Sequence, residues 1–407
     1  MKISVIVPCH NNSHIENVLD SVISQLRSED EIIVVDDYSD EKTKETLDKM
    51  KDRGVLVVHS QKRGNRSANR NLAAGMSRGE LLLFLDGDVL LETGALEKIR
   101  EYDFGSVSGI CGSVAAMRML PETADIYFKS YFDKKSSYPD FDLWHTAFPD
   151  AREKSENLPW NRFYTALAVV PREKYLQAGG FDESFEGWGA EDVDIGYRLS
   201  KLGKLKTAPH IRAIHIPHKR NILNEEISGR TNMYAMLKKY RNRDMEELLS
   251  FALKESASEA LSRVIKTLSQ LEGESISTPE TKGELVFNSI SKSHPEGNIV
   301  RFDDVGGLIS ESFIGLALPF DDGYFDSVSA TTELFDYPEP LAARILQELL
   351  RVSGQVKIKK VPPRSVNWAG IEEKFMHIFC YYKIYLFADS YQDFCIEDKG
   401  EFYLVTR

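Results

Sequence analysis

Along residues 1–120, blocks of apolar and polar residues alternate and predict strands followed by helices. Residues 3–7, 31–35 and 55–59 are short apolar runs that stop at turn-forming residues, which is typical of buried strands. Apolar positions in 15–26 recur at helical spacing, and a polar helix is predicted over 41–53. Because strands alternate with helices, we expect right-handed crossovers and a mainly parallel α/β sheet.

The first helix has a predicted N-terminal cap. Pro8 ends the preceding strand, and either Asn12 or Ser13 can cap the helix. Glu16 stands three residues after Ser13, which is the spacing of a capping box. We therefore expect the helix to begin directly after one of these two residues.

An apolar run within residues 79–91 stops at two carboxylates separated by one glycine, Asp86-Gly87-Asp88. Such a run predicts a buried strand, and in open α/β sheets ligands bind beyond the carboxyl ends of the strands. Gly87 permits a sharp turn, so both carboxylates can face one hard cation and its phosphate oxygens. Asp-Gly is also a common turn signal, so the neighbouring motifs decide between a turn and a site.

Residues 63–71, just before this strand, are rich in arginine and asparagine and predict a basic helix. Arg66 and Arg70 are four residues apart and share one face of that helix. A solvated helix face would explain them if the segment stood alone. Beside two acidic strand ends, the favoured interpretation is that they bind a nucleotide diphosphate.

Residues 179–199 combine glycine-rich loops with a cluster of acids. Gly180 lies in a loop where a substrate can approach the backbone, and Trp188 stands between two glycines. A helix is predicted from about Ala190, with Glu191 and Asp192 in its first turn. Stabilisation of a helix N-terminus accounts for one acid there. Several acids behind Gly-Trp-Gly instead favour a substrate-binding or catalytic site.

Taken in order, the stretches Val-Ile-Val-Pro, Val-Val-Asp-Asp-Tyr-Ser-Asp, Asn-Arg-Asn and Phe-Leu-Asp-Gly-Asp resemble the N-terminal half of a family 2 glycosyltransferase. The resemblance implies a GT-A fold with a Rossmann-like sheet, and a UDP-sugar as donor. It implies that Asp37 binds the uracil ring, that Pro8 lies along the ring and that Arg70 supports the nucleotide. Asp86 would reach the ribose or the metal, and Asp88 would ligate the metal.

The string Gly-Trp-Gly-Ala-Glu-Asp resembles the acceptor and base motif of inverting galactosyl-, N-acetylgalactosaminyl- and chondroitin-type transferases. By that match Asp192 is the general base, Glu191 binds the acceptor, and Trp188 belongs to a loop that closes over the donor. His215 and His218 follow this pattern and would complete the metal site. Imidazoles together with carboxylates favour Mn2+, with Mg2+ as the other candidate.

Three segments are expected: a catalytic domain over 1–223, a helical bridge and linker over 224–282, and a smaller α/β module over 283–407. The stretch Leu-Pro-Phe-Asp-Asp-Gly-Tyr-Phe-Asp-Ser-Val, which begins at Leu318, resembles the later half of a class I methyltransferase. Residues 291–295 lack the glycine turn that would cradle S-adenosylmethionine after the first strand. A degenerate, non-catalytic module is therefore favoured over an active methyltransferase.

Composition and charge limit the classes of partner and the compartment that we expect. The chain has 407 residues, of which 42% are hydrophobic and 28% charged, as in ordinary soluble globular proteins. Its net charge of -12 argues against nucleic acid as the main partner, because phosphates demand a basic face. The four cysteines show no zinc or disulfide spacing, which favours a reducing cytoplasm; they are Cys9, Cys111, Cys380 and Cys395.

No segment is long and apolar enough to span a bilayer, and residues 1–8 are predicted to be a strand rather than part of a signal peptide. The expected location is the cytoplasm, with contact to the inner face of the membrane left open. Aromatic residues are frequent in 121–160 and in 375–387. Core packing is the favoured explanation for both segments, and an oligomer contact stays open for both. An acceptor surface stays open for 121–160, and a membrane-surface patch for 375–387.

These patterns predict a metal-dependent inverting glycosyltransferase that moves a hexose or N-acetylhexosamine from a UDP-sugar to a hydroxyl group, in glycan or polysaccharide synthesis. The acceptor is a glycan, a lipid-linked sugar or a peptide. A sugar nucleotidyltransferase is one alternative, but residues 9–12 are not the glycine- and arginine-rich phosphate loop that it would need. The other is a non-catalytic regulator that binds a nucleotide sugar or a carbohydrate on a transferase scaffold.

Overall fold

The computed structural model describes residues 1–116, 145–146, 156–218, 221–251, 255–270, 277–290, 297–362, 364, 366 and 395–406. The chain divides into two compact units, Met1–Asn232 and Met233–Arg407, each with its own sheet. The division falls inside helix α8 (Ile222–Tyr240), and α9 (Arg243–Phe251) and α10 (Glu255–Leu268) belong to the second unit.

The sheet of the first unit begins with a parallel half and continues into a mixed half. The strands β3, β2, β1 and β4 pair in parallel, as the alternating pattern predicts. From β4 onwards, β8 is antiparallel to both of its neighbours, β4 and β6, whereas β6 and β9 are parallel. In spatial order the strands are β3 (Leu56–His59), β2 (Glu31–Asp36), β1 (Ile3–Cys9), β4 (Leu81–Leu85), β8 (Leu167–Pro171), β6 (Val107–Ala116), β9 (Lys204–His215) and β5 (Val89–Leu91), with β7 (His145–Thr146) beside β6.

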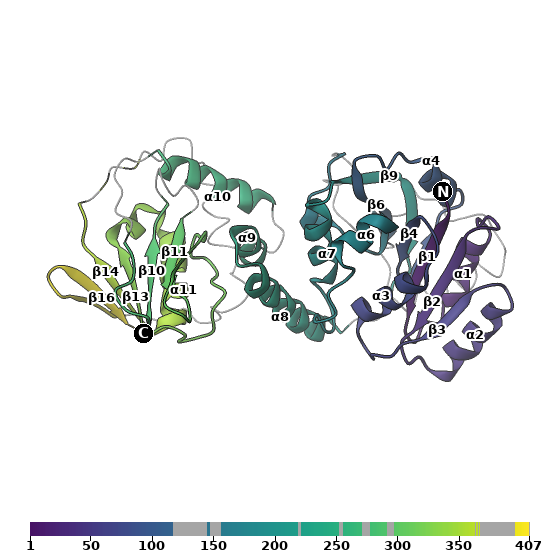
Figure 1. The fold of residues 1–407 in the computed structure, drawn as a ribbon, viewed down its shortest axis with the longest axis horizontal. Helices are drawn as coiled ribbons and strands as arrows, with labels where there is room; N and C mark the ends of the chain where they lie inside the picture. Colours follow the sequence, from purple (N-terminus) through teal and green to yellow (C-terminus); the bar gives the residue numbers. More distant parts are fainter. Residues whose placement is uncertain are drawn as a thin grey trace. The chain divides into compact units, whose positions relative to one another are not determined.

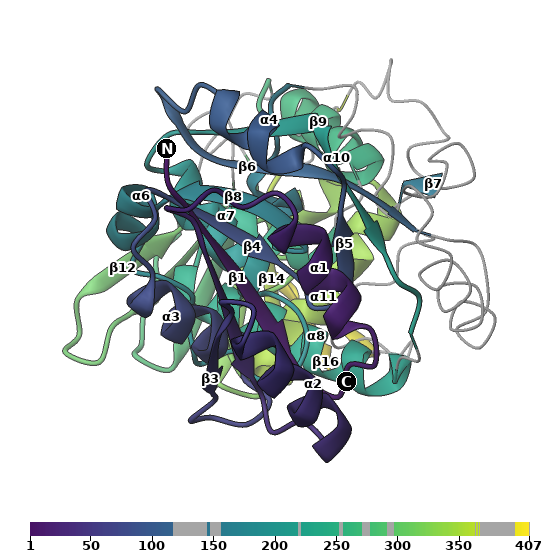
Figure 2. The same ribbon diagram turned by 90° about the vertical axis from the view of Figure 1, so that its right-hand side faces the viewer.

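Two apolar layers cover this sheet, one on each face, because successive residues of a strand point to opposite sides. In β1, Val5 and Val7 contribute to one buried cluster and Ile6 to the other. Figure 1 shows the two sets of helices on either side of the strands, and in Figure 2 α1 lies in front of them. The first face carries α1 (Ile15–Ile23), α2 (Glu41–Lys51) and α4 (Ala95–Glu101), and the second carries α3 (Arg66–Met76), α6 (Arg172–Ala178) and α7 (Glu191–Ser200).

Strand β9 is longer than the predicted segment 204–208 and runs to His215. It continues because both β6 and β5 pair with it. In the antiparallel pair with β5, Val89 lies opposite His215, and the N–H of Ile216 donates to the carbonyl of Asp88 at 2.8 Å. The pairing therefore brings the end of β9 beside the Asp-Gly-Asp turn.

The predicted capping box on Ser13 is wrong. Helix α1 begins at Ile15, and its N-cap residue His14 makes no side-chain cap. The Asn12 side chain instead accepts from the His14 N–H at 2.8 Å and donates to the Gly87 carbonyl at 2.5 Å. Asn12 thus ties the loop after β1 to the Asp-Gly-Asp turn, which delays the start of the helix.

The second unit also has an α/β sheet, so the predicted fold class with a second, smaller α/β part is confirmed. Its strands β10, β13 and β14 pair in parallel, while β11 and β12 are added as antiparallel neighbours. Helix α11 (Glu339–Ser353) joins β13 to β14. In spatial order the strands are β12 (Leu308–Glu311), β11 (Asn298–Phe302), β10 (Glu284–Asn288), β13 (Ser327–Thr331), β14 (Gln355–Lys359), β16 (Phe402–Thr406) and β15 (Cys395–Asp398).

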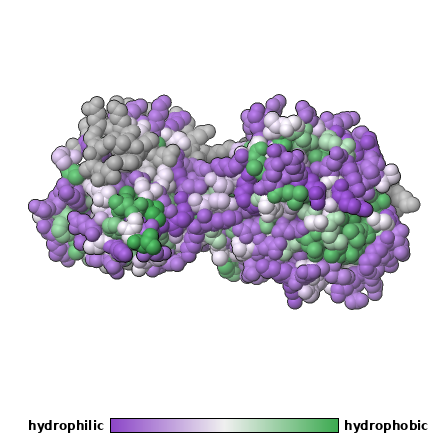
Figure 3. All heavy atoms as spheres, viewed as in Figure 1, coloured by the Kyte–Doolittle hydropathy of each residue, from purple (hydrophilic) through white to green (hydrophobic). Residues whose placement is uncertain are grey.

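The faces seen in Figure 3 are mostly hydrophilic, as the charged fraction of the sequence leads one to expect. Among the described residues, no helix has the length and apolar character needed to cross a membrane. The thiols of Cys9 and Cys111 are buried, and that of Cys395 is exposed. The aromatic-rich segment 375–387 and most of 121–160 lie outside the described residues.

Candidate active site

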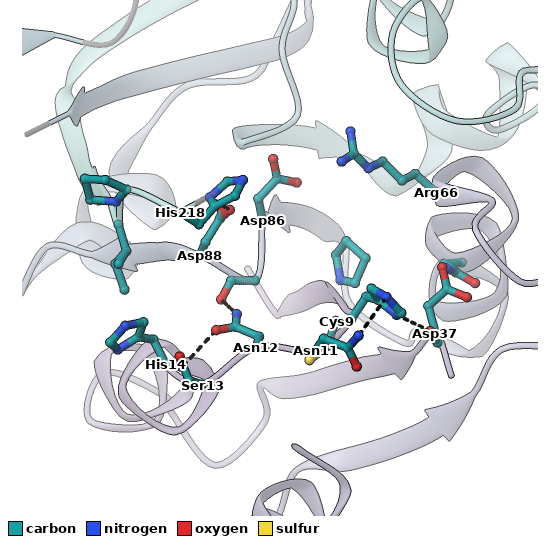
Figure 4. Close-up of a pocket in the computed structure, with 16 residues that line it drawn as sticks. Cys9, Asn11, Asn12, Ser13, His14, Asp37, Arg66, Asp86, Asp88 and His218 are labelled. Carbon is teal, nitrogen blue, oxygen red and sulfur yellow. Dashed lines mark hydrogen bonds and ion pairs between the residues drawn. The ribbon is translucent and has the colours of Figure 1, made fainter. Parts of the chain in front are cut away.

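A cleft of about 700 Å³ opens at the carboxyl ends of β1, β2 and β4. This is the edge at which ligands bind in open α/β sheets. Six of the residues predicted from the sequence line it, and Figure 4 shows Arg66 and Asp86 facing each other across it. These six are Pro8, Asp37, Arg66, Asp86, Asp88 and His218.

Asp88, His215 and His218 converge as the sequence predicts, and one ligand atom from each lies within 4.8 Å of the others. Asp88 Oδ2 is 3.0 Å from His218 Nδ1 and 3.6 Å from His215 Nε2. Burial opposes ionisation of Asp88, yet its hydrogen bonds to the two imidazoles hold its pKa well below the usual range. The cluster therefore offers one carboxylate and two nitrogen ligands to a cation.

Arg70 is buried at the centre of a second cluster, which contains three carboxylates. Its Nη2 is 2.9 Å from Asp86 Oδ1, and its Nη1 is 3.3 Å from Glu191 Oε1 and 3.5 Å from Asp192 Oδ1. Burial would lower the pKa of Arg70, but the three carboxylates raise it above its ordinary value. The guanidinium also stacks over Phe181, with 5.3 Å from Cζ to the ring centroid. Arg70 thus partly neutralises three carboxylates that come from two segments, the turn after β4 and the start of α7.

The sequence predicts that Arg70 supports the nucleotide, and the structure shows how it is placed relative to the cleft. Arg70 is absent from the described residues that line the cleft, whereas Asp86 is among them. A ligand in the cleft would therefore meet Asp86, with Arg70 behind it. Asp86 joins the two clusters, because it stands two residues before Asp88 in the same turn.

Asp192 has the electrostatics of a group that can exchange a proton near neutral pH. Burial, followed by the nearby charges of Glu191 and Asp86, raises the pKa of Asp192 to about 7, against the opposing effects of Arg70 and Thr165. Its side chain is 21% exposed, and Asp192 is not among the described residues that line the cleft. A base with a pKa near the working pH is suited to proton transfer.

The two adjacent aspartates after β2 have different surroundings. Asp36 is buried and contacts His59 Nδ1 at 3.1 Å and the Ser39 N–H at 3.1 Å. Asp37 lines the cleft, and both of its carboxylate oxygens accept from the Gly64 N–H at 3.0 Å. Only Asp37 is therefore placed to meet a ligand, in line with the site predicted from the sequence.

Cys9 also lines the cleft, but its chemistry is not that of a reactive thiol. Burial, followed by the charge of Asp36, raises the pKa of Cys9 to about 12. The thiol stays protonated at neutral pH, and a protonated thiol is a poor nucleophile and metal ligand.

Gly180 and Trp188 lie apart from the described lining of the cleft. Gly180 has a φ of +72°, and a Cβ there would lie 2.9 Å from Asn71 Oδ1, so a tight turn explains this glycine. The Trp188 side chain is 41% exposed, while its backbone N–H donates to Ser228 Oγ at 3.1 Å and its carbonyl accepts from Asn232. The loop that carries Trp188 is therefore attached to α8.

Sequence reasoning missed Asn12, which fixes the Asp-Gly-Asp turn, and Thr165, which contacts Asp192 with its hydroxyl at 2.6 Å and its N–H at 3.1 Å. Thr165 belongs to no motif and lies far from Asp192 along the chain. Its hydroxyl could be recognised only once α7 was packed against the segment before β8.

Comparison with known proteins assigns this unit to a class. Residues 4–120 match the model of glycosyl transferase family 2, and residues 148–219 match that of the N-terminal domain of galactosyltransferase. The second match includes Glu191, Asp192 and both histidines of the metal cluster. Both matched models describe glycosyltransferases, so the N-terminal unit is similar to a glycosyltransferase domain.

Validoxylamine A glucosyltransferase from Streptomyces hygroscopicus subsp. limoneus is 26% identical over 246 residues, which are 54% of this chain and 52% of the relative. Poly(ribitol-phosphate) beta-N-acetylglucosaminyltransferase TarP from Staphylococcus aureus (strain N315) is 39% identical over 107 residues, which are 25% of this chain and 32% of the relative. The matches thus span about half of the first relative and a third of the second.

Among solved structures, the mannosyltransferase PcManGT from Pyrobaculum calidifontis, in complex with GDP-Man and Mn2+, is similar to 58% of this chain and 63% of its own. The identity is 21% and the TM-score is 0.42. A likeness at this level does not decide the ligands of the present chain.

Proposed function

We propose that the N-terminal unit is a metal-dependent inverting glycosyltransferase that moves a hexose or N-acetylhexosamine from a UDP-sugar to an acceptor hydroxyl. The observation that carries this proposal is the Asp86-Gly87-Asp88 turn. Asp88 belongs to the cluster that can bind a cation, and Asp86 is bonded to the arginine that also contacts Asp192. A leaving diphosphate and an acceptor can therefore meet at one turn of the backbone.

The donor set fits Mn2+ or Mg2+, and the imidazoles favour Mn2+. Asp88, His215 and His218 would hold the ion, since a ligand atom from each lies within 4.8 Å of the others and Asp88 is held ionised. When bound, the ion would supply counter-charge to the leaving diphosphate. Asn12 supports this arrangement by holding the carbonyl of Gly87.

Asp192 would act as the general base. Its carboxylate would accept the proton of the acceptor hydroxyl as that oxygen attacks the anomeric carbon from the face opposite the diphosphate, which inverts the configuration. Glu191 would orient the acceptor, since it is the neighbouring carboxylate in the same cluster. Arg70 limits the mutual repulsion of these acids.

The donor would occupy the cleft. Asp37 and Pro8 line it at the ends of β2 and β1, which suits the predicted contact with uracil, and Arg66 is an exposed cation that also lines it. Gly180 would then contribute by leaving room for the Asn71 side chain, which is hydrogen-bonded to the backbone of Phe181. Trp188 would belong to a loop that closes over the donor and is attached to α8.

The test is a screen of UDP-glucose, UDP-galactose, UDP-N-acetylglucosamine and UDP-N-acetylgalactosamine for release of UDP, with Mn2+ and with excess EDTA. The proposal expects Mn2+-dependent release from at least one donor. Release of pyrophosphate from UTP and a sugar phosphate, without release of UDP, would instead support the nucleotidyltransferase.

For the second unit we propose a methyltransferase-like α/β module that does not bind S-adenosylmethionine. A nucleotide site of this type needs a first strand followed by a helix whose N-terminus faces the ligand. Here β10 is followed by its antiparallel neighbour β11 after residues 289–297, which is shorter than a helical crossover between parallel strands.

Side chains of this unit also occupy its sheet edge. Glu246 of α9 is buried and accepts from the N–H groups of Ile314 at 2.7 Å and Leu316 at 2.5 Å, in the loop after β12. At the end of β10, the Ile290 N–H donates to the buried Tyr337 hydroxyl at 3.1 Å. Amides that a ligand could use are thus already bonded within the unit.

A further inference from the structure

Thr165 lies between the short 3-10 helix η2 (Trp160–Arg162) and strand β8, and it is fully buried. Helix α7, which carries Asp192, packs closely on this segment because Gly196 has no side chain. A Cβ on Gly196 would lie 2.5 Å from the Trp160 carbonyl oxygen and 2.6 Å from the Phe163 Cβ. Asp192 and Gly196 are four residues apart on one helix face, so the same close approach brings Asp192 to Thr165.

Thr165 holds both oxygens of the Asp192 carboxylate. Its hydroxyl donates to Oδ1 at 2.6 Å, and its backbone N–H donates to Oδ2 at 3.1 Å. Arg70 Nη1 approaches Oδ1 as well, at 3.5 Å. Among the contacts of the described residues, Oδ1 is therefore engaged by a hydroxyl and a cation, whereas Oδ2 accepts only from one amide and retains accepting capacity.

We propose that Thr165 is a positioning residue which fixes the Asp192 carboxylate through Oδ1, so that Oδ2 is the oxygen that takes the proton of the acceptor hydroxyl. This inference rests on the proposed function for the role of Asp192 as base. In the transfer, the acceptor O–H bond breaks, its proton goes to Oδ2, and its oxygen forms the new bond to the anomeric carbon as the bond to the diphosphate breaks.

The charged groups that face Asp192 come from three elements, Glu191 on α7, Asp86 after β4 and Arg70 on α3. The two acids disfavour the ionised carboxylate, and Arg70 favours it. Thr165 adds donors without adding charge, and charge-assisted hydrogen bonds of this kind are among the stronger ones. Loss of the hydroxyl should therefore raise the pKa of Asp192 further, because the ionised form loses a partner.

The test compares Thr165→Val, which removes the hydroxyl and keeps the N–H, with Thr165→Ser, which keeps both. Asp192→Asn is made in the wild-type background and in each of the Thr165→Val, Thr165→Ser and Thr331→Val backgrounds. Thr331→Val is the matched control, since Thr331 is a buried threonine of the second unit whose hydroxyl donates to Glu333 at 2.9 Å. The first readout is the urea midpoint of unfolding, measured as a function of pH. In each background, the midpoint of the Asp192→Asn partner is subtracted from that of the protein with Asp192. The pH dependence of this difference reports the ionisation of Asp192.

In that readout, Thr165→Val is expected to move the ionisation of Asp192 to higher pH by about one unit or more, while Thr165→Ser and Thr331→Val leave it in place. An unchanged ionisation in Thr165→Val would overturn the inference. This measurement needs no turnover, so its failure is distinct from failure of the proposed function.

The second readout is the pH profile of UDP release from UDP-glucose and UDP-N-acetylglucosamine with Mn2+, with water as acceptor. Thr165→Val should lower release about tenfold on the acid side of the profile and leave the donor KM within about twofold, and Thr165→Ser should restore the wild-type profile. Within the Asp192→Asn background, Thr165→Val should have no further effect on release. A uniform loss at every pH, or a further loss in that background, would overturn the inference.

Discussion

His215 Nε2 lies 3.6 Å from Asp88 Oδ2, although the two residues are far apart in the sequence of the first unit. The distance follows from the antiparallel pairing of β5 with β9, in which Val89 stands opposite His215. Two of the three residues that could hold a cation, Asp88 and His215, are therefore positioned by the sheet, and His218 is supplied by the segment after the strand. Ligands held in this way need little reorganisation when a cation binds.

The first prediction concerns the metal. Asp88→Ala should abolish specific binding of Mn2+ without unfolding the protein, because it removes the only carboxylate of the cluster. Calorimetric titration with MnCl2 measures this directly. His59→Ala is the control, since His59 is an exposed histidine on β3 that contacts Asp36 outside the cluster. Equal binding of Mn2+ by wild type and Asp88→Ala would exclude this metal site.

A second prediction separates the roles of the two acids at the start of α7. Asp192→Asn should keep donor affinity and lower turnover by roughly two to four orders of magnitude, the range of a lost general base. Glu191→Gln should raise the acceptor KM more than the donor KM. If Asp192→Asn transferred sugar at nearly the wild-type rate and Glu191→Gln did not, the two roles would be exchanged.

The third prediction is a dependence of stability on pH. The pKa of Asp192 is raised from 3.8 to about 7 in the folded protein, so the native state binds this proton more tightly than the unfolded state does. The stabilisation is complete below about pH 4 and is lost as the pH rises through 7. Asp192→Asn should therefore gain stability over wild type, by about 2 kcal/mol between pH 5.5 and pH 8. Urea unfolding at both pH values checks this, and a difference that is constant with pH would count against the assigned environment.

The fourth prediction compares two arginines of one helix. Arg70→Met should destabilise the first unit by about 3–5 kcal/mol, because it leaves three clustered carboxylates without their buried partner. Arg66→Met should leave stability nearly unchanged and weaken donor binding, because Arg66 is exposed at the cleft. Denaturation curves and titration with UDP distinguish the two. A larger loss of stability in Arg66→Met than in Arg70→Met would contradict the placement of these side chains.

The fifth prediction concerns the second unit. The full chain should show no saturable heat on titration with S-adenosylmethionine, because Glu246 and Tyr337 already occupy backbone amides at the sheet edge. Glu246→Ala should destabilise this unit, since it leaves buried N–H groups of the 314–317 loop without a partner. Saturable micromolar binding to the wild-type chain would show that a cradle exists elsewhere in the unit.

Much of the first unit could be predicted from its sequence, because its signals are local. Apolar runs that end in acids located β2 and β4, and the motif around Asp192 located the start of α7. The contact between Arg70 and the acids of α7 could not be predicted, because it depends on how α3 and α7 pack on one face of the sheet. The same holds for the bond from the Asn12 side-chain amide to the carbonyl of Gly87, which joins two segments that are distant in the sequence.

The central claim is that the turn of Asp86 and Asp88 serves metal-dependent transfer from a UDP-sugar. The most direct measurement is UDP release from the four UDP-sugars by wild type and Asp88→Ala, each with Mn2+ and with excess EDTA. The account predicts release by wild type with Mn2+ from at least one donor, with loss of release in EDTA and in Asp88→Ala. Full turnover of wild type in EDTA, or of Asp88→Ala in Mn2+, would contradict it.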